Sequence, residues 1–151
     1  MTEPQDQPES KIGLPNSPMP DRLRFTDFEL ERLSNGRCRA RITLTWNDEQ
    51  EFKGDSDGLA SQAGELRCAA QACVEALSKS VGAAVRFELF GVKAVRAFDS
   101  SVVIVSLALS GETGNHRVVG CCLTDGDLSR GAALAVLNAT NRVLGNRFFM
   151  R

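Results

Sequence analysis

The chain has 151 residues, of which 42% are hydrophobic and 25% charged, and its formal net charge is -1. This balance is typical of a folded globular domain and excludes a wholly disordered chain, a collagen and a coiled coil. Because 18 lysines and arginines are matched by 19 aspartates and glutamates, we expect no general binding of nucleic acids.

All five prolines lie within the first 20 residues, among Gln, Glu, Asp and Ser. Such a segment has too little apolar surface to fold, so residues 1–22 are predicted to form a disordered acidic tail and residues 23–151 a single domain. No basic segment followed by an apolar stretch marks a signal peptide, and the longest apolar run, residues 102–109, is too short to cross a membrane. We therefore expect a cytoplasmic protein without a membrane partner.

Strand patterns open the first half of the domain. Apolar residues alternate with acidic ones over residues 28–31, and with arginine and threonine over residues 37–46. A third strand is predicted over residues 50–53, and the Gly- and Asp-rich residues 54–58 are predicted to end it as a turn.

The second half repeats this order. Strands are predicted over residues 85–95, with a bulge at Gly91, over residues 101–109 and over residues 117–123. The middle strand is mostly apolar, broken by Ser106, and this composition is typical of a strand buried on both faces.

A helical period follows each set of strands. The first helix has Glu65 on its polar face and Gly82 as its C-cap, and the second spans residues 128–144 with Asp127 as N-cap and Gly145 as C-cap. The chain is therefore predicted to be an α+β fold of two βββα units, residues 26–82 and 85–146. Antiparallel sheets would pack against the two helices with pseudo-twofold symmetry.

Matching residues support this internal repeat. Six helix positions recur 63 residues later: Arg67, Ala69, Ala70, Ala72, Ala76 and Gly82 match Arg130, Ala132, Ala133, Ala135, Ala139 and Gly145. At the front of each unit, Phe28-Glu29-Leu30 recurs as Phe87-Glu88-Leu89.

Few residues suit catalysis. The one histidine, His116, cannot form a His-based metal site alone, and we interpret it as an exposed turn residue, with a Ser-His-Asp or Cys-His pair as the alternative. The five cysteines lack paired C-x-x-C spacing, so free thiols are expected rather than a disulfide scaffold or a zinc site. Cys121 and Cys122 should point to opposite faces of a strand, a thiol switch being the alternative. We expect no enzyme, no catalytic residue, no metal and no cofactor.

Binding is suggested at two places. The arginines at positions 37, 39 and 41 form a stripe that can bind a phosphate or carboxylate, although the solvated face of a sheet has the same pattern. Asp57-Gly58 and Asp125-Gly126 each precede a helix whose free amides can receive a carboxylate; the alternative is that these pairs are only turns.

The second helix is apolar almost all round over residues 132–137, which predicts burial on more than one side. A partner subunit or a deep position within the domain can supply that burial. Asn138 and Asn141 can form hydrogen bonds across a homodimer contact.

Two segments carry a family resemblance. The helix ending Val136-Leu137-Asn138-Ala139-Thr140-Asn141-Arg142 is similar to the Tyr-Leu-Asn-Ala-Leu-Asn-Arg type of ending in the C-terminal regulatory domain of 2-isopropylmalate synthase, shared with citramalate synthase. The Gly-rich segment 54–58 is similar to the Gly-x-Gly-containing turn of that domain. With its two βββα units, the chain resembles this domain over residues 26–146. The His-x-His metal ligands of the synthase are absent, and Leu59-Ala60-Ser61-Gln62 stands where the family usually has Pro-Val-Asp-Ala.

The resemblance implies a homodimer that binds leucine or isoleucine near the helix starts. Helix amides would hold the carboxylate of the amino acid while an aspartate meets its ammonium group. The implied contacts are Asp57, Gly58, Leu59 and Ala60 in the first unit, and Asp125, Gly126, Asp127, Leu128 and Ser129 in the second.

The leading hypothesis is a non-catalytic, small-molecule-binding or regulatory module that senses a branched-chain amino acid or a related acid. The alternative is a ligand-free homodimerisation or scaffold protein that binds a protein partner. The order α-β-β-β-α over residues 59–144 also matches a double-stranded RNA-binding domain. The second helix starts without lysine, however, so no nucleic acid is expected.

Overall fold

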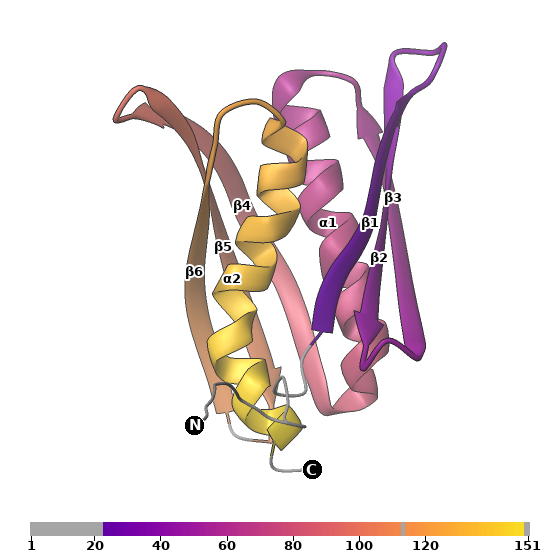
Figure 1. The fold of residues 1–151 in the computed structure, drawn as a ribbon, viewed down its shortest axis with the longest axis vertical. Helices are drawn as coiled ribbons and strands as arrows, with labels where there is room; N and C mark the ends of the chain where they lie inside the picture. Colours follow the sequence, from indigo (N-terminus) through magenta and orange to yellow (C-terminus); the bar gives the residue numbers. More distant parts are fainter. Residues whose placement is uncertain (1–22, 113, 150–151) are drawn as a thin grey trace, which may run out of the picture.

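The computed structural model describes residues 23–112 and 114–149, and it contains six strands and two long helices in the order βββα, βββα (Figure 1). The predicted α+β fold of two βββα units is confirmed. The predicted tail, residues 1–22, lies outside the described residues. The elements are β1 (Leu23–Arg32), β2 (Arg37–Trp46), β3 (Gln50–Leu59), α1 (Gln62–Val81), the short 3-10 helix η1 (Gly82–Ala84), β4 (Val85–Ala97), β5 (Ser100–Gly111), β6 (Gly114–Thr124) and α2 (Leu128–Phe149).

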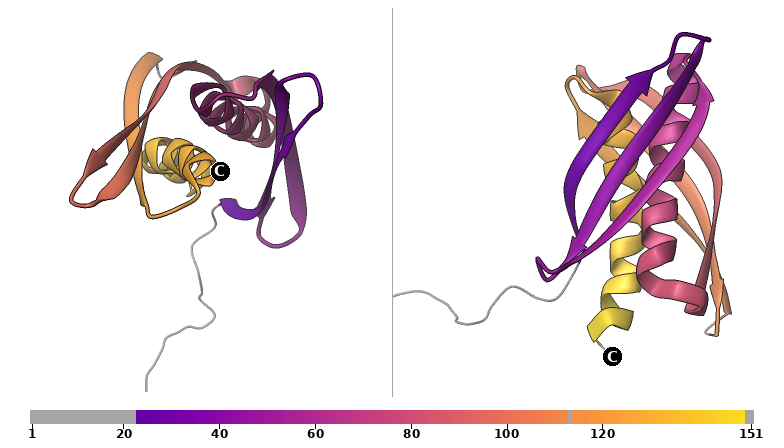
Figure 2. Two further views of the ribbon diagram at one scale, coloured as in Figure 1. Left: turned by 90° about the horizontal axis from the view of Figure 1, so that it is seen from above. Right: turned by 90° about the vertical axis from the view of Figure 1, so that its right-hand side faces the viewer.

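The two helices lie side by side between two antiparallel sheets (Figure 2). The first sheet has the order β1-β2-β3 and packs against α1, and the second has the order β4-β5-β6 and packs against α2. Helix α1 also contacts α2 and β4. Each sheet therefore turns one face to the helix pair and the other outward. Over residues 23–112 and 114–149, no helix combines the length and apolar character that a membrane span requires.

Strand β2 shows why the first sheet forms. Its Cys38, Ala40, Ile42 and Leu44 are buried against α1, while the arginines at positions 37, 39 and 41 alternate with them and point outward, as predicted. Two of these arginines pair with acids of neighbouring strands, Arg39 with Asp57 and Arg41 with Glu29. The arginine stripe is thus the solvated, ion-paired face of a sheet.

The repeat is visible in the strand register. A bulge interrupts β1 between Phe25 and Asp27, and another interrupts β4 between Leu89 and Gly91, as predicted for Gly91. Phe25 pairs with Leu44 next to the first bulge, and Leu89 pairs with Leu107 next to the second. The two sheets therefore share the same irregularity at the same place.

The sequence match between Phe28-Glu29-Leu30 and Phe87-Glu88-Leu89 is wrong as a structural equivalence. Phe28 lies after the bulge of β1, whereas Phe87 lies before the bulge of β4. Strands of alternating residues produce such matches by chance, and only the register separates them.

The helix part of the repeat is confirmed by two glycines. A Cβ atom on Gly54 of β3 would overlap the carbonyl oxygen of Ala72, and one on Gly120 of β6 would overlap that of Ala135. In each unit the backbone of the helix thus lies directly against the backbone of the third strand. The helix residues in contact, Ala72 and Ala135, are equivalent in the helix repeat. Glycine and alanine are needed there because a larger side chain would hold helix and strand apart.

Strand β3 is longer than predicted. It continues through residues 54–58 to Leu59, so Asp57 and Gly58 lie in a strand and the predicted turn is wrong. Asp57 pairs with Arg39 in the ladder, and Gly58 pairs with Cys38. Local propensity disfavours a strand at these residues, but hydrogen bonds to the neighbouring strand β2 hold them in one.

Both helix ends were predicted from glycines. Gly82 has a positive φ of 66° and its amide bonds to the carbonyl of Ser78, which confirms it as the C-cap of α1. Helix α2 instead continues through Gly145 to Phe149, so the predicted C-cap is wrong. The residues that follow Gly145 in α2 include no proline that would end a helix.

Burial of the apolar segments follows the layers. Residues 132–137 of α2 were predicted to be buried on more than one side. All of them are buried within the chain itself except Leu134, which is half-buried against the core. In contrast, β5 buries only one face, formed by Val103, Val105, Leu107 and Leu109, and its other face is half-buried. The prediction that this strand is covered on both faces is wrong for the described residues.

Candidate functional site

Both long helices start at the same end of the molecule (Figure 1). The hydroxyl of Ser61 caps α1 by accepting a hydrogen bond from the amide of Gly64 at 3.1 Å. The carboxylate of Asp127 caps α2 by accepting one from the amide of Arg130 at 3.0 Å, which confirms the predicted N-cap. The positive ends of two helix dipoles therefore lie at one end of the fold.

A pocket of about 440 Å³ lies at these two helix starts, and we call it the helix-start pocket. It takes residues from the end of β1, from the start of α1 and from the start of α2. Five predicted site residues meet here: Ala60, Gly126, Asp127, Leu128 and Ser129. The other lining residues are Leu30, Arg32, Gln62, Glu65 and Leu66.

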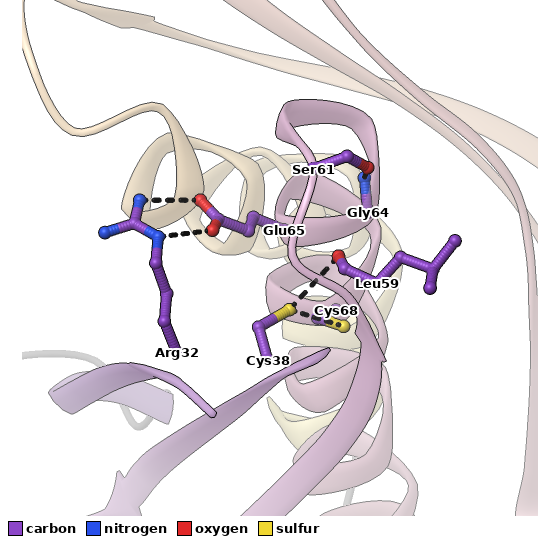
Figure 3. Close-up of polar contacts among 7 residues, drawn as sticks. All are labelled: Arg32, Cys38, Leu59, Ser61, Gly64, Glu65 and Cys68. Atoms are coloured by element: carbon purple, nitrogen blue, oxygen red, sulfur yellow. Dashed lines mark hydrogen bonds and ion pairs between the residues drawn. The ribbon is translucent and has the colours of Figure 1, made fainter. Parts of the chain in front are cut away.

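An ion pair forms one wall of this pocket (Figure 3). The Arg32 guanidinium donates two hydrogen bonds to the Glu65 carboxylate, from Nε to Oε2 at 2.6 Å and from Nη2 to Oε1 at 2.9 Å. The Glu65 carboxylate raises the pKa of Arg32 further above its ordinary value, first through these bonds and then through its charge. Glu65 is only 8% exposed, so its predicted place on the polar face of α1 is wrong.

The two partners differ in their access to solvent. The side chain of Arg32 is 71% exposed and that of Glu65 11%. The Arg32 guanidinium therefore has N–H donors exposed to solvent, while the Glu65 carboxylate is buried beneath it. Leucines at positions 30, 66 and 128 add apolar surface to the same pocket.

The pocket thus combines a cation, carboxylates, helix amides and apolar side chains. A small zwitterion with an apolar side chain presents the complementary groups: a carboxylate, an ammonium and a hydrocarbon. With the repeat offset of 63 residues, Glu65 of α1 is equivalent to Leu128 of α2. At this position the first helix therefore presents a carboxylate to the pocket and the second an apolar side chain.

The remaining predicted residues of the first unit line a different pocket. Asp57, Gly58 and Leu59 belong to a pocket of about 400 Å³ beside β3, together with Ser56, Gly64, Arg67, Cys68 and Gln71. Leu59 and Ala60, although adjacent in sequence, line different pockets. The carboxylate of Asp57 is held by Arg39, whose Nε lies 2.8 Å from Oδ1.

Two of the remaining predicted residues, Asp125 and Asn138, form hydrogen bonds within their own unit. Asp125 lines neither of these two pockets, and its carboxylate accepts a hydrogen bond from the hydroxyl of Ser100 at 2.9 Å. The amide of Asn138 donates to the carbonyl of Cys121 on β6 at 2.7 Å, and Asn141 is exposed. Contact of the two asparagines with a second copy stays a prediction.

Arg32 and Glu65 were not among the site residues predicted from the sequence. Glu65 is the acidic residue of the first turn of α1, and Arg32 is the last residue of β1. These positions were visible in the sequence, but their pairing joins residues 33 positions apart and depends on how β1 lies beside α1.

The described cysteines are free thiols, as expected. Cys38 lies 3.5 Å from Cys68, measured between the sulfurs, and donates to the carbonyl of Leu59 at 3.4 Å (Figure 3). Burial raises the pKa of Cys68 to about 12, so this thiol stays protonated at neutral pH. Cys121 is exposed whereas Cys122 packs against the core, which confirms that they point to opposite faces.

The pair of Arg39 and Asp57 leads to a pH prediction. Hydrogen bonding from Arg39 holds the pKa of Asp57 below its ordinary value, so its contribution to stability is present above the unfolded pKa of about 3.9 and is lost as the pH falls through the folded pKa. We expect Asp57→Asn to lower stability slightly at neutral pH, and the difference from the unchanged protein to vanish in acid. Urea unfolding at neutral and acidic pH measures this, with Glu49→Gln at the β2–β3 turn as control. A constant difference would contradict the prediction.

The comparisons with known proteins identify no family: no protein-family model matches this chain, and no curated protein matches it.

Proposed function

We propose that this chain is a non-catalytic regulatory module that binds a small amino acid or a related carboxylate in the helix-start pocket. The observation that carries the proposal is the meeting of both helix starts with Arg32 and Glu65 in one pocket. The volume of about 440 Å³ lies within the range of about 300 to 1,000 Å³ that is typical of small-molecule sites.

The chemistry of the lining suggests an orientation for the ligand. Its carboxylate would meet the outward donors of Arg32 and the first-turn amides of the helices. Its ammonium group would meet Glu65 or Asp127, and its side chain the leucines at positions 30, 66 and 128. The choice of a branched-chain amino acid comes from the resemblance to the regulatory domain of 2-isopropylmalate synthase.

A thermal-shift panel tests the proposal. It contains leucine, isoleucine, valine, their 2-oxo acids and citramalate. A ligand at about 100 times its dissociation constant stabilises the folded state by about 2.7 kcal/mol, which corresponds to a shift on the order of 10 °C for a domain of this size. A shift with one branched-chain compound supports the proposal. No shift with any compound contradicts it and leaves the scaffold alternative.

Two substitutions locate the site. A Cβ atom on Gly126 would meet no other atom within 4 Å, so Gly126→Phe places a large ring at the pocket without a backbone clash. We expect Gly126→Phe to abolish the thermal shift and Gly126→Ala, its matched control, to retain it. A shift that persists in Gly126→Phe would place the ligand elsewhere.

Glu65→Gln distinguishes the contact made by the ammonium group of the ligand from the contact made by its carboxylate. Removal of this carboxylate should weaken binding of an amino acid at least tenfold, or about 1.4 kcal/mol, because an ammonium loses its charged acceptor. A 2-oxo acid has no ammonium, so it should lose less affinity than the amino acid. Calorimetric titration of both ligands measures the difference, and an equal loss for both would contradict the orientation.

A further inference from the structure

The outward face of the second sheet carries a cluster of exposed apolar residues. We call it the outer face, and it consists of the side chains of β4, β5 and β6 that point away from the helix pair. Its three most exposed large apolar residues are Phe90, Val119 and Leu123, which are 47%, 59% and 63% exposed. Neighbouring residues across the strands form rows on this face: Val95 with Val102 and Leu123, Lys93 with Ile104 and Cys121, Gly91 with Ser106 and Val119, Glu88 with Ala108 and Arg117, and Arg86 with Ser110 and Asn115.

The corresponding face of the first sheet is charged. There the rows are Glu29 with Arg41 and Asp55, and Glu31 with Arg39 and Asp57, and two ion pairs join their members. The two sheets share one architecture, so the fold itself does not require an apolar outward face. The second unit has apolar residues at several outward positions where the first unit has ion-paired ones.

The central strand of this face shows the same property. The outward residues of β5 include Val102, Ile104 and Ala108, which lie opposite the fully buried positions of the strand. Its composition predicts a strand covered on both faces, and within the described residues the helix pair covers only one. We propose that the outer face of the second sheet is covered by the same face of a second copy of this chain.

The size of the face suits a dimer. Its strands have 13, 12 and 11 residues. With a rise of about 3.3 Å per residue and a spacing of about 4.8 Å between strands, the face measures about 40 by 14 Å. Two such faces would bury on the order of 1,100 Å², close to the lower limit of specific interfaces, so a dimer of moderate affinity is expected.

The charges at the margin of the face are self-complementary. A twofold axis parallel to β5 would place β4 of one copy over β6 of the other. Each row of residues would then face the same row of the second copy. Glu88 would then face the partner's Arg117, and the pair would form twice. Among the described residues Glu88 has no ion-pair partner in its own chain, while Arg117 lies 4.2 Å from the centre of the Phe90 ring.

The other charged residues of the face, Arg86 and Lys93, are compatible with this arrangement. Arg86 is exposed and lies in the row of Ser110 and Asn115 near the β5–β6 hairpin, so its guanidinium can stay in water at the end of the face. Lys93 lies on β4, an edge strand, so its ammonium can reach the rim of the interface while its stem covers apolar surface. The acidic, Pro-rich composition of residues 1–22 makes that segment a poor cover for an apolar sheet. The inference does not depend on the proposed ligand, because residues of the outer face do not line the helix-start pocket.

Sedimentation equilibrium of the full chain tests the proposal. Over about 1 µM to 1 mM, the unchanged protein should pass from monomer to dimer. The double variant Val119→Glu, Leu123→Glu should weaken association at least tenfold, because each interface would bury four new carboxylates. Both positions are mostly exposed, so the variant should fold, which circular dichroism checks. A monomer over the whole range, or a dimer unaffected by the double variant, would overturn the proposal.

A matched control lies on the first sheet. Lys53 occupies the place on β3 that Val119 occupies on β6, one residue before the glycine that meets the helix. Lys53→Glu should leave association unchanged. If it weakened the dimer as strongly as the double variant, net charge or the other face would explain the result and the proposal would fail.

Charge reversal tests the twofold axis. Glu88→Arg should weaken the dimer, and adding Arg117→Glu should restore it at least in part, because the pair is re-formed with opposite signs. Failure to restore would overturn the axis along β5. Labelling of exposed Cys121 with a thiol reagent gives a second readout: it should slow as protein concentration rises, and a rate independent of concentration would contradict the covered face.

Discussion

Replacement of Gly54 by alanine is expected to lower the free energy of unfolding by about 3 kcal/mol or more. The new methyl group would overlap the carbonyl oxygen of Ala72 and lie 2.5 Å from the amide nitrogen of Ala76. These are backbone atoms of α1, so relief requires a shift of the whole helix away from β3. Gly120→Ala should have a similar effect, because its methyl group would meet Ala135 and Ala139 of α2 in the same way.

Urea unfolding measures both effects, with Gly126→Ala as the matched control. A Cβ atom at Gly126 meets nothing within 4 Å, and its φ lies outside the left-handed region, so stability should change by less than about 1 kcal/mol. Stability of Gly54→Ala equal to that of the control would contradict the close contact between helix and strand.

Truncation of the two equivalent core leucines is the second large effect. We expect Leu44→Ala and Leu107→Ala each to lower the free energy of unfolding by about 3 kcal/mol, because both side chains are fully buried and alanine would leave a cavity. Each pairs with the residue that precedes the bulge in the first strand of its unit. The repeat therefore predicts similar losses at the two positions.

The control for this pair is Leu59→Ala. Leu59 is 64% exposed, so its truncation should cost no more than about 0.5 kcal/mol. A loss at Leu107 that is small while the loss at Leu44 is large would show that the second unit is packed less tightly than the first. That outcome would contradict the equivalence of the two cores.

The two proposals concern different parts of the molecule and can fail independently. The helix-start pocket lies at one end of the helix pair, whereas the proposed dimer face lies on the outside of the second sheet. A ligand-induced shift in a monomer would support only the sensor. A dimer without any shift would support only the interface and favour a scaffold.

Much of the candidate site was predictable, because helix starts have local signals. Aspartate is a preferred N-cap residue, and Asp127 stands directly before an apolar helical period. The start of α2 could therefore be located from the sequence, and with it the pocket residues from Gly126 to Ser129. The error at Asp57 and Gly58 had a specific cause. Asp and Gly favour turns in isolation, but here the ladder to β2 and the Arg39 ion pair keep them in a strand.

Four features follow from the sequence alone: the order of the elements, the inward face of β2, the caps at Gly82 and Asp127, and the helix repeat. These features depend on residues close together in the chain, where periodicity and capping act. Tertiary contacts are needed to show that β3 continues to Leu59, that Glu65 is buried beside Arg32, and that one face of β5 is covered. Those outcomes depend on which distant segments lie side by side, and local propensity carries no information about that.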